Sequence, residues 1–143
     1  MGMIKHVSVL LLLIPFYAHS EQYVCTPEKM TGFKYDSQEK KWNYAKFKTD
    51  FQYVLTPGKG KFAFNLVKVG DANPTGGCEK GFNDAGFLFC SIPDGDFKFN
   101  KFNGRYLLVS DIGYYLVGKG MWAETDEDSG DLAFQIGKCK PFN

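Results

Sequence analysis

The densest group of residues that could do chemistry is the acidic run over residues 124–131. Clustered carboxylates are the ligands that hard cations such as calcium prefer. Asp126, Asp128 and Asp131 are the candidate metal ligands, and the spacing of Asp126, Asp128 and Gly130 matches part of a calcium loop. The run lacks the third acid before the glycine and the closing glutamate of a complete loop. The competing interpretation is therefore a solvated hairpin loop.

The first twenty residues have the features of a removable signal peptide. A positive charge precedes a short apolar run over residues 7–16. Ala18 and Ser20 place small residues at the −3 and −1 positions of a cut after Ser20. We therefore expect residues 1–20 to be a signal peptide. Residues 21–143 would then be a single exported domain with no membrane span, located in the periplasm or secreted.

Cleavage would remove both histidines, His6 and His19. Histidine is the usual general base and metal ligand near neutral pH. The serines have no Gly-x-Ser-x-Gly frame, and the Gly-Lys-Gly triplets at 58–60 and 118–120 lack the spacing of a phosphate loop. Paired carboxylates can hydrolyse a glycoside without histidine, but nothing in the sequence places two acids about a sugar. We expect no catalytic residue, no cofactor and no enzymatic activity.

All four cysteines follow the expected cut: Cys25, Cys78, Cys90 and Cys139. An even number of cysteines in an exported chain indicates two disulfides. Three pairings are possible. We favour Cys25–Cys139, which would tie the two ends of the domain together, with Cys78–Cys90, which would close a short loop.

The charge of the chain is balanced. Cleavage removes one of the 17 basic residues, and all 16 acidic residues follow the cut. Binding to nucleic acid needs a strong basic surplus, so we expect no nucleic-acid partner. Lysines dominate residues 21–70 and acids dominate residues 71–143, which would give a dipolar surface able to steer a charged partner.

Short aromatic runs alternate with turn clusters along the whole chain, as in antiparallel sheet proteins. The 14 Phe, 8 Tyr and 2 Trp favour strands. The expected strand segments are residues 23–25, 32–35, 42–47, 51–55, 62–67, 86–90, 97–100, 105–109, 114–117, 121–123 and 132–139. We expect an all-β antiparallel meander that forms a small closed or nearly closed barrel, with a two-layer sandwich as the alternative. A Cys25–Cys139 bond would place the first and last strands side by side, which favours the barrel.

The segment from Cys78 to Cys90 is rich in glycine and aromatic residues. As structure, it is a stapled turn that leads into a core strand. As function, it is a rigid loop that presents Phe82 and Asn83 to a partner, because preorganised loops lose less entropy on binding and aromatic anchors dominate interfaces.

Three segments resemble, in residue type and spacing, a group of small exported proteins of proteobacteria: Tyr-Val-Cys-Thr at 23–26, Gly-Phe-Asn at 81–83 and Ile-Gly-Lys-Cys at 136–139. The likeness spans nearly the whole mature chain. It implies a Gram-negative periplasmic or secreted setting and no activity. At the level of fold, the chain is also similar in style to bacterial inhibitors of lysozyme, although the Ser-x-x-Ala-Arg-Tyr binding loop associated with them is absent here.

Three functional hypotheses follow. The first is an exported, non-enzymatic binding or interaction module, inhibitor-like in character, that engages a protein or glycan partner. The second is a lipocalin-like carrier of a small apolar ligand, because eight strands can enclose one small ligand or be filled by side chains. The third is a hydrolase that works through carboxylates.

Overall fold

The computed structural model describes residues 21–142, and the expected signal peptide lies outside them. The described chain forms nine strands and one short helix. Their bounds are β1 Tyr23–Asp36, β2 Lys41–Lys46, β3 Tyr53–Pro57, β4 Phe64–Lys68, β5 Gly76–Cys78, β6 Phe87–Ile92, β7 Gly95–Asn100, β8 Arg105–Ser110, α1 Ile112–Tyr115 and β9 Leu132–Pro141.

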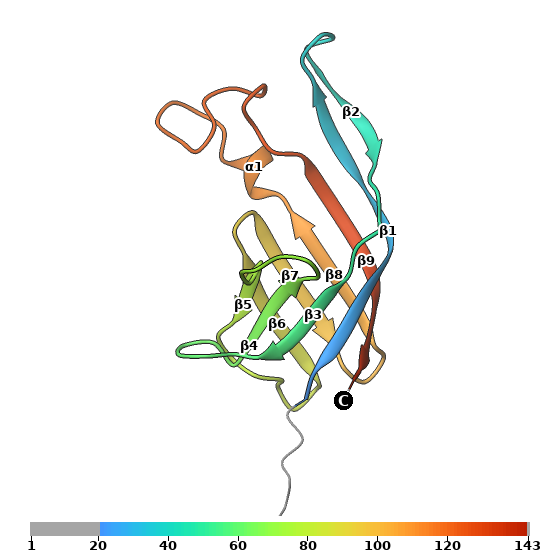
Figure 1. Ribbon diagram of the computed structural model, residues 1–143. Helices are drawn as coiled ribbons and strands as arrows, with labels where there is room; N and C mark the ends of the chain where they lie inside the picture. Colours follow the sequence, from blue (N-terminus) through green and yellow to red (C-terminus); the bar gives the residue numbers. More distant parts are fainter. Residues whose placement is uncertain (1–20, 143) are drawn as a thin grey trace, which may run out of the picture.

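Eight of the strands form a closed antiparallel barrel (Figure 1). The order around it is β1-β3-β4-β5-β6-β7-β8-β9, and β9 pairs with β1 to close the ring. Closure leaves these strands no free edge over their paired lengths. The expected all-β barrel is confirmed, and the alternative sandwich is not what the chain forms.

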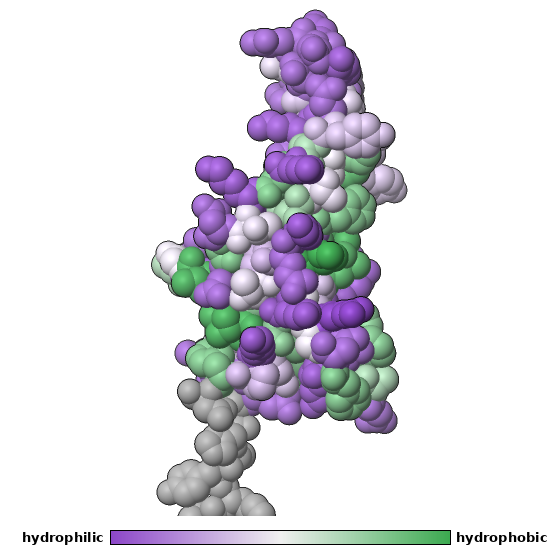
Figure 2. Space-filling view, turned by 90° about the vertical axis from the view of Figure 1, so that its right-hand side faces the viewer, coloured by the Kyte–Doolittle hydropathy of each residue, from purple (hydrophilic) through white to green (hydrophobic). Residues whose placement is uncertain are grey.

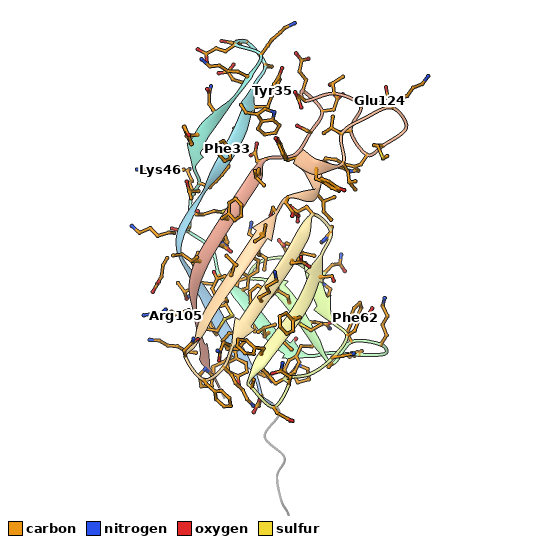
Figure 3. The ribbon with its side chains drawn as sticks, turned by 180° about the vertical axis from the view of Figure 1, so that it is seen from behind. Phe33, Tyr35, Lys46, Phe62, Arg105 and Glu124 are labelled. Carbon is orange, nitrogen blue, oxygen red and sulfur yellow. A yellow bond between two sulfur atoms is a disulfide. The ribbon has the colours of Figure 1, made fainter. Side chains whose placement is uncertain are left out.

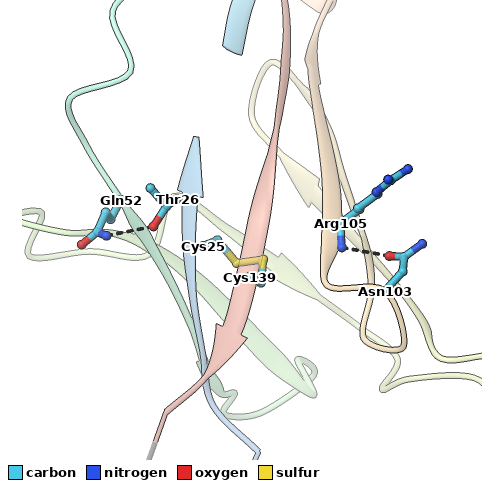
Figure 4. Close-up of a disulfide and its surroundings, with 6 residues drawn as sticks. All are labelled: Cys25, Thr26, Gln52, Asn103, Arg105 and Cys139. Atoms are coloured by element: carbon cyan, nitrogen blue, oxygen red, sulfur yellow. Dashed lines mark hydrogen bonds between the residues drawn. A yellow bond between two sulfur atoms is a disulfide. The ribbon is translucent and has the colours of Figure 1, made fainter. Parts of the chain in front are cut away.

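Both expected disulfides are confirmed. Cys25 and Cys139 are direct cross-strand neighbours on β1 and β9, so their bond crosses the seam that closes the barrel (Figure 4). Cys78 and Cys90 join β5 to β6, which share a single backbone pair. The first bond therefore reinforces an extensively paired seam, and the second lies at the strand pairing with the fewest backbone pairs.

Side chains fill the barrel interior. The largest fully buried ones are Phe97, Phe99, Leu55, Leu66 and Leu88. At the end of the barrel where the described chain begins, the ring of Phe82 packs against Phe99 and Tyr23. Burial of so much apolar area is the main favourable contribution to folding.

The strand β1 contains an irregularity that changes which of its side chains face inward. Pro27 pairs with Gly137, but the next pair joins Lys29 to Ile136, so Glu28 is an extra residue in a β-bulge. Odd-numbered residues face the interior before the bulge, and even-numbered residues face it afterwards, beginning with Met30. The side chains of the second half of β1 therefore point the opposite way from what simple alternation gives.

Beyond the bulge, β1 pairs with β2 and the two strands project from the barrel as a two-stranded arm, residues 31–46 (Figure 1). The sequence predicted two short segments at 23–25 and 32–35 in place of one strand of 14 residues. Pro27 does not interrupt the strand, because a bulge is one of the few places in a sheet that accepts proline.

Two expected strands, at 114–117 and 121–123, are wrong. Residues 111–131, here called the upper loop, instead contain α1 and irregular chain with one isolated bridge between Val117 and Ala123. The backbone amides of Asp111 and Ile112 both donate to the carbonyl of Asp94, which turns the chain away from the sheet. Because β8 pairs with β7 and β9, and β9 pairs with β8 and β1, neither of the strands that flank this segment in sequence has a free edge for it.

Candidate functional site

The arm carries a row of aromatic side chains on one face. Phe33 lies opposite Tyr44, with ring centroids 5.1 Å apart, and Tyr35 lies opposite Trp42, with centroids 5.6 Å apart. Direct cross-strand neighbours point to the same side of a sheet. Because of the β-bulge, that side is continuous with the outside of the barrel.

The aromatic face continues down the outer wall of the barrel. Phe134 on β9 lies opposite Val109 on β8, and Ile136 lies opposite Leu107. On its other side Phe134 is opposite Thr31 of the arm, which joins the two regions. We call the combined set the outer stripe: Phe33, Tyr35, Trp42, Tyr44, Leu107, Val109, Phe134 and Ile136.

The outer stripe is accessible. Tyr44 is 90% exposed, Ile136 49% and Phe134 43%. In Figure 2, a polar tip of the arm lies above a region of apolar side chains on the same side of the molecule. Single exposed apolar residues are common, but contiguous apolar patches mark interaction surfaces.

Basic side chains border the outer stripe: Lys29, Lys46, Lys98, Arg105 and Lys138. Lys46 and Arg105 point away from the barrel in Figure 3. Among the described residues only Lys138 of this set forms an ion pair, at 3.6 Å with Glu28. The acidic neighbours of the stripe on this side are Glu28 and Asp96, which lies opposite Val109. Five basic groups against these two carboxylates leave the border with a net positive charge.

The upper loop holds the arm in place. Tyr114 of α1 packs on Trp42 with ring centroids 5.0 Å apart. Burial, followed by the charges of Asp126 and Glu127, raises the pKa of Tyr35, which means that the acidic end of the loop lies near the arm. The arm, which carries half of the stripe, is thus braced by the upper loop.

A second feature lies at the mouth of the barrel, under the upper loop. It is an open cavity of about 340 Å³, here called the mouth cavity. Its lining residues are Met30, Phe47, Asp94, Ser110, Gly113, Trp122, Gly130, Asp131 and Ala133. They come from β1, the chain after β2, the β6–β7 turn, the end of β8, the upper loop and the start of β9.

Phe82 and Asn83 lie at the opposite end of the barrel from the arm. The Phe82 ring is half-buried and contacts Tyr23, Phe64 and Phe99, with centroid distances of 5.7, 5.4 and 5.7 Å. The Asn83 carboxamide accepts a hydrogen bond from the amide of Phe87 at 2.9 Å. Both residues thus close the end of the barrel, and a binding role for them stays a prediction.

The expected metal ligands do not form a cluster. Within residues 21–142, no three His, Cys, Asp or Glu side chains are gathered in a way that could hold a metal ion. The Asp128 carboxylate accepts a hydrogen bond from the Thr125 hydroxyl at 2.8 Å, while Asp131 lines the mouth cavity. Calcium binding by Asp126, Asp128 and Asp131 stays a prediction without geometric support.

Comparison with protein families, curated proteins and solved structures gives no match for this chain. In the part of the chain that the structure describes, no helix has the length and apolar character needed to cross a membrane.

Sequence reasoning missed both the outer stripe and the mouth cavity. The stripe had a signal in the pairing of aromatic residues across the turn at 36–41, since Phe33, Tyr35, Trp42 and Tyr44 alternate with polar neighbours. No residue pattern in the sequence marks the bulge at Glu28, which sets the direction of this face. The cavity is assembled from six separate segments, so no local pattern could reveal it.

Proposed function

We propose that this protein is an exported, non-enzymatic binding module that docks a partner protein on the outer stripe. The observation that carries the proposal is the continuity of the stripe across four neighbouring strands, from Trp42 on β2 to Leu107 on β8. Aromatic side chains are enriched among the residues that dominate interface energetics. The chain holds its stripe on paired strands, so little ordering entropy would be lost on binding.

The charges around the stripe favour a partner whose docking face is apolar at its centre and acidic at its rim. Lys46 and Lys98 lie on opposite sides of the apolar wall residues and have no ion-pair partner among residues 21–142. Complementary charge speeds association and selects among partners. A glycan partner, the other class expected from the sequence, would use the aromatic rings without needing this basic border.

The hypothesis of a carrier with a ligand inside the barrel has less support than docking on the outer stripe. The filled interior leaves no deep chamber between Phe97, Phe99 and Leu66, each fully or almost fully buried. Space for a small ligand lies in open pockets at the surface, among them the mouth cavity and a pocket of about 430 Å³ beside Phe62, Gly76 and Ile92. The hydrolase hypothesis gains no specific observation, because the two carboxylates of the mouth cavity, Asp94 and Asp131, are both exposed.

Site-specific photocrosslinking tests the docking proposal. We would place p-benzoylphenylalanine at position 134, within the outer stripe, and in a matched variant at position 89. Phe89 is also an exposed phenylalanine on the barrel wall, but Lys98 separates it from Leu107. The expected result is one stoichiometric adduct from position 134 and none from position 89, with the crosslinked partner residue on an acidic surface.

Binding of the captured partner should then be measured with purified proteins. The changes Phe134→Ser and Lys46→Glu should each weaken it at least about tenfold, whereas Phe89→Ser should not. Equal crosslinking from both positions, or affinity unchanged by Phe134→Ser, would refute docking on the stripe.

A further inference from the structure

The charged groups that line the mouth cavity are all carboxylates. Two carboxylates, Asp94 and Asp131, and the hydroxyl of Ser110 are its polar side chains, and none of its lining residues is basic. Neither carboxylate forms an ion pair with any residue in 21–142. The cavity therefore offers negative charge and hydrogen-bond acceptors without a cation to balance them.

The rest of the lining is apolar and aromatic. Trp122 and Phe47 contribute ring surfaces, and Met30 and Ala133 contribute aliphatic surface. Ring faces attract cations, and indole does so best. The mouth cavity has a volume of about 340 Å³, which is within the range of small-molecule sites. Such sites are mostly apolar with a few placed polar groups.

A buried acceptor without a donor lies next to this lining. Gln135 is fully buried and follows Ala133 on the interior face of β9. Its Oε1 accepts no hydrogen bond, while its amide nitrogen is 4.0 Å from the sulfur of Met30, which lines the cavity. An unpaired buried acceptor is unfavourable, so an N–H donor that reached it would be favoured.

The charge of Asp94 also reaches the barrel interior. Burial is the larger cause that raises the pKa of the interior phenol of Tyr53 to about 12, and the charge of Asp94 is the second. Burial opposes a charge of either sign, so only the contribution of Asp94 bears on the charge of a ligand, and a carboxylate favours a cation.

We propose that the mouth cavity binds a small organic cation, a primary amine with an apolar or aromatic body. Asp94 and Asp131 hold the ammonium group, and Trp122 and Phe47 cover the apolar body. This site is independent of the outer stripe, which shares no residue with the cavity lining.

The chain has two tryptophans, Trp42 and Trp122, and this makes a direct test possible. In a Trp42→Phe variant, Trp122 is the single tryptophan and reports on the cavity alone. Phenethylamine is the probe, and phenethyl alcohol is its neutral control with the same aromatic body. Titration is followed by tryptophan emission and by calorimetry.

We expect saturable binding of phenethylamine and binding of phenethyl alcohol that is weaker by about tenfold or more. Asp94→Asn and Asp131→Asn should each weaken amine binding by about tenfold, and the double variant should abolish it. Asp126→Asn, which removes a carboxylate from the same loop outside the cavity, is the matched control and should bind as the parent does. Circular dichroism and the melting midpoint establish that each variant is folded.

Three outcomes would overturn the proposal: no saturation by phenethylamine, equal affinity for the alcohol, or unchanged affinity in the folded Asp94→Asn/Asp131→Asn variant. A stripe variant such as Phe134→Ser should keep amine binding intact. Failure of protein docking and failure of amine binding are therefore separate results.

Discussion

The indole of Trp42 packs edge-on against the ring of Tyr114, with an interplanar angle of 83°. The two residues come from β2 and α1, which are far apart in sequence and have no backbone pairing with each other. This contact is the brace between the arm and the upper loop.

A double-mutant cycle measures that brace. Trp42→Leu and Tyr114→Leu, alone and together, should give a coupling energy of about 0.5–1.5 kcal/mol in urea unfolding, because offset and edge-on aromatic pairs contribute about that much beyond burial. Tyr115→Leu is the control, since Tyr115 is 78% exposed and makes no aromatic contact with the arm. A Trp42–Tyr114 coupling no larger than the Trp42–Tyr115 coupling would show that the contact does not hold the arm.

The two disulfides should differ in their contribution to stability. Cys25–Cys139 closes a loop with a sequence separation of 114, and Cys78–Cys90 one of 12. In the chain-entropy treatment the longer loop is worth about 5 kcal/mol and the shorter about 3 kcal/mol. Replacing each pair with alanines and measuring the free energy of unfolding should give losses in that order. The reverse order would mean that the Cys78–Cys90 bond supports the β5–β6 pairing more than it constrains the unfolded chain.

Removing the hydroxyl of Tyr106 should stabilise the protein. The Tyr106 Oη is buried inside the barrel and has no hydrogen-bond partner. Tyr106→Phe deletes this polar atom and keeps the ring stacked on Phe97, so the free energy of unfolding should rise by up to about 1 kcal/mol. Tyr44→Phe, at a 90% exposed position, should leave it unchanged. A loss of stability in Tyr106→Phe would mean that the hydroxyl has a partner in solution.

Alkaline pH should unfold the protein through its buried tyrosines. Burial, with the nearby Glu21 carboxylate, raises the pKa of Tyr23 from its ordinary value of 10.0 to about 12. Burial with the charge of Asp94 raises the pKa of Tyr53 by the same amount, to about 12. The folded state thus favours the neutral phenols. Their contribution to stability is fully present below pH 10 and is lost as the pH rises towards 12.

Urea unfolding at a series of pH values checks this. Tyr53→Phe should make the fall in stability above pH 10 less steep, because one linked proton is removed. Tyr44→Phe is again the exposed control and should keep the parent slope. A slope identical in Tyr53→Phe and the parent would exclude Tyr53 as one of the linked groups.

Much of the framework could be predicted from the sequence. Turn clusters between aromatic runs placed most strands within a few residues, and the cysteine positions led to both disulfides. The turn clusters and the Cys78–Cys90 spacing are local signals. The Cys25–Cys139 pairing follows from joining the two ends of the domain. The aromatic segment at 114–117 was predicted wrongly because strand propensity cannot tell whether a partner strand is available.

The orientation of side chains was harder to predict. The alternation of Leu132, Phe134 and Ile136 indicated a strand, but the interior face of β9 carries Ala133 and Gln135 instead. The narrow barrel is already filled by large side chains from other strands, among them Tyr106, whose ring lies over Gly137. Which face turns inward was therefore decided by the volume available in the assembled barrel, which no single segment contains.

The bulge at Glu28 divides β1 into a barrel portion before it and an arm portion after it. Before it, β1 is held in register by Cys25–Cys139 and by pairing with β3 and β9. After it, Lys29 continues the pairing with β9 at Ile136. Deleting Glu28 would join Pro27 directly to Lys29, which would keep this pairing in ordinary alternation and leave Phe33 and Tyr35 on the outer face. The bulge therefore absorbs a one-residue difference in chain length without changing the face on which the arm displays its aromatic side chains.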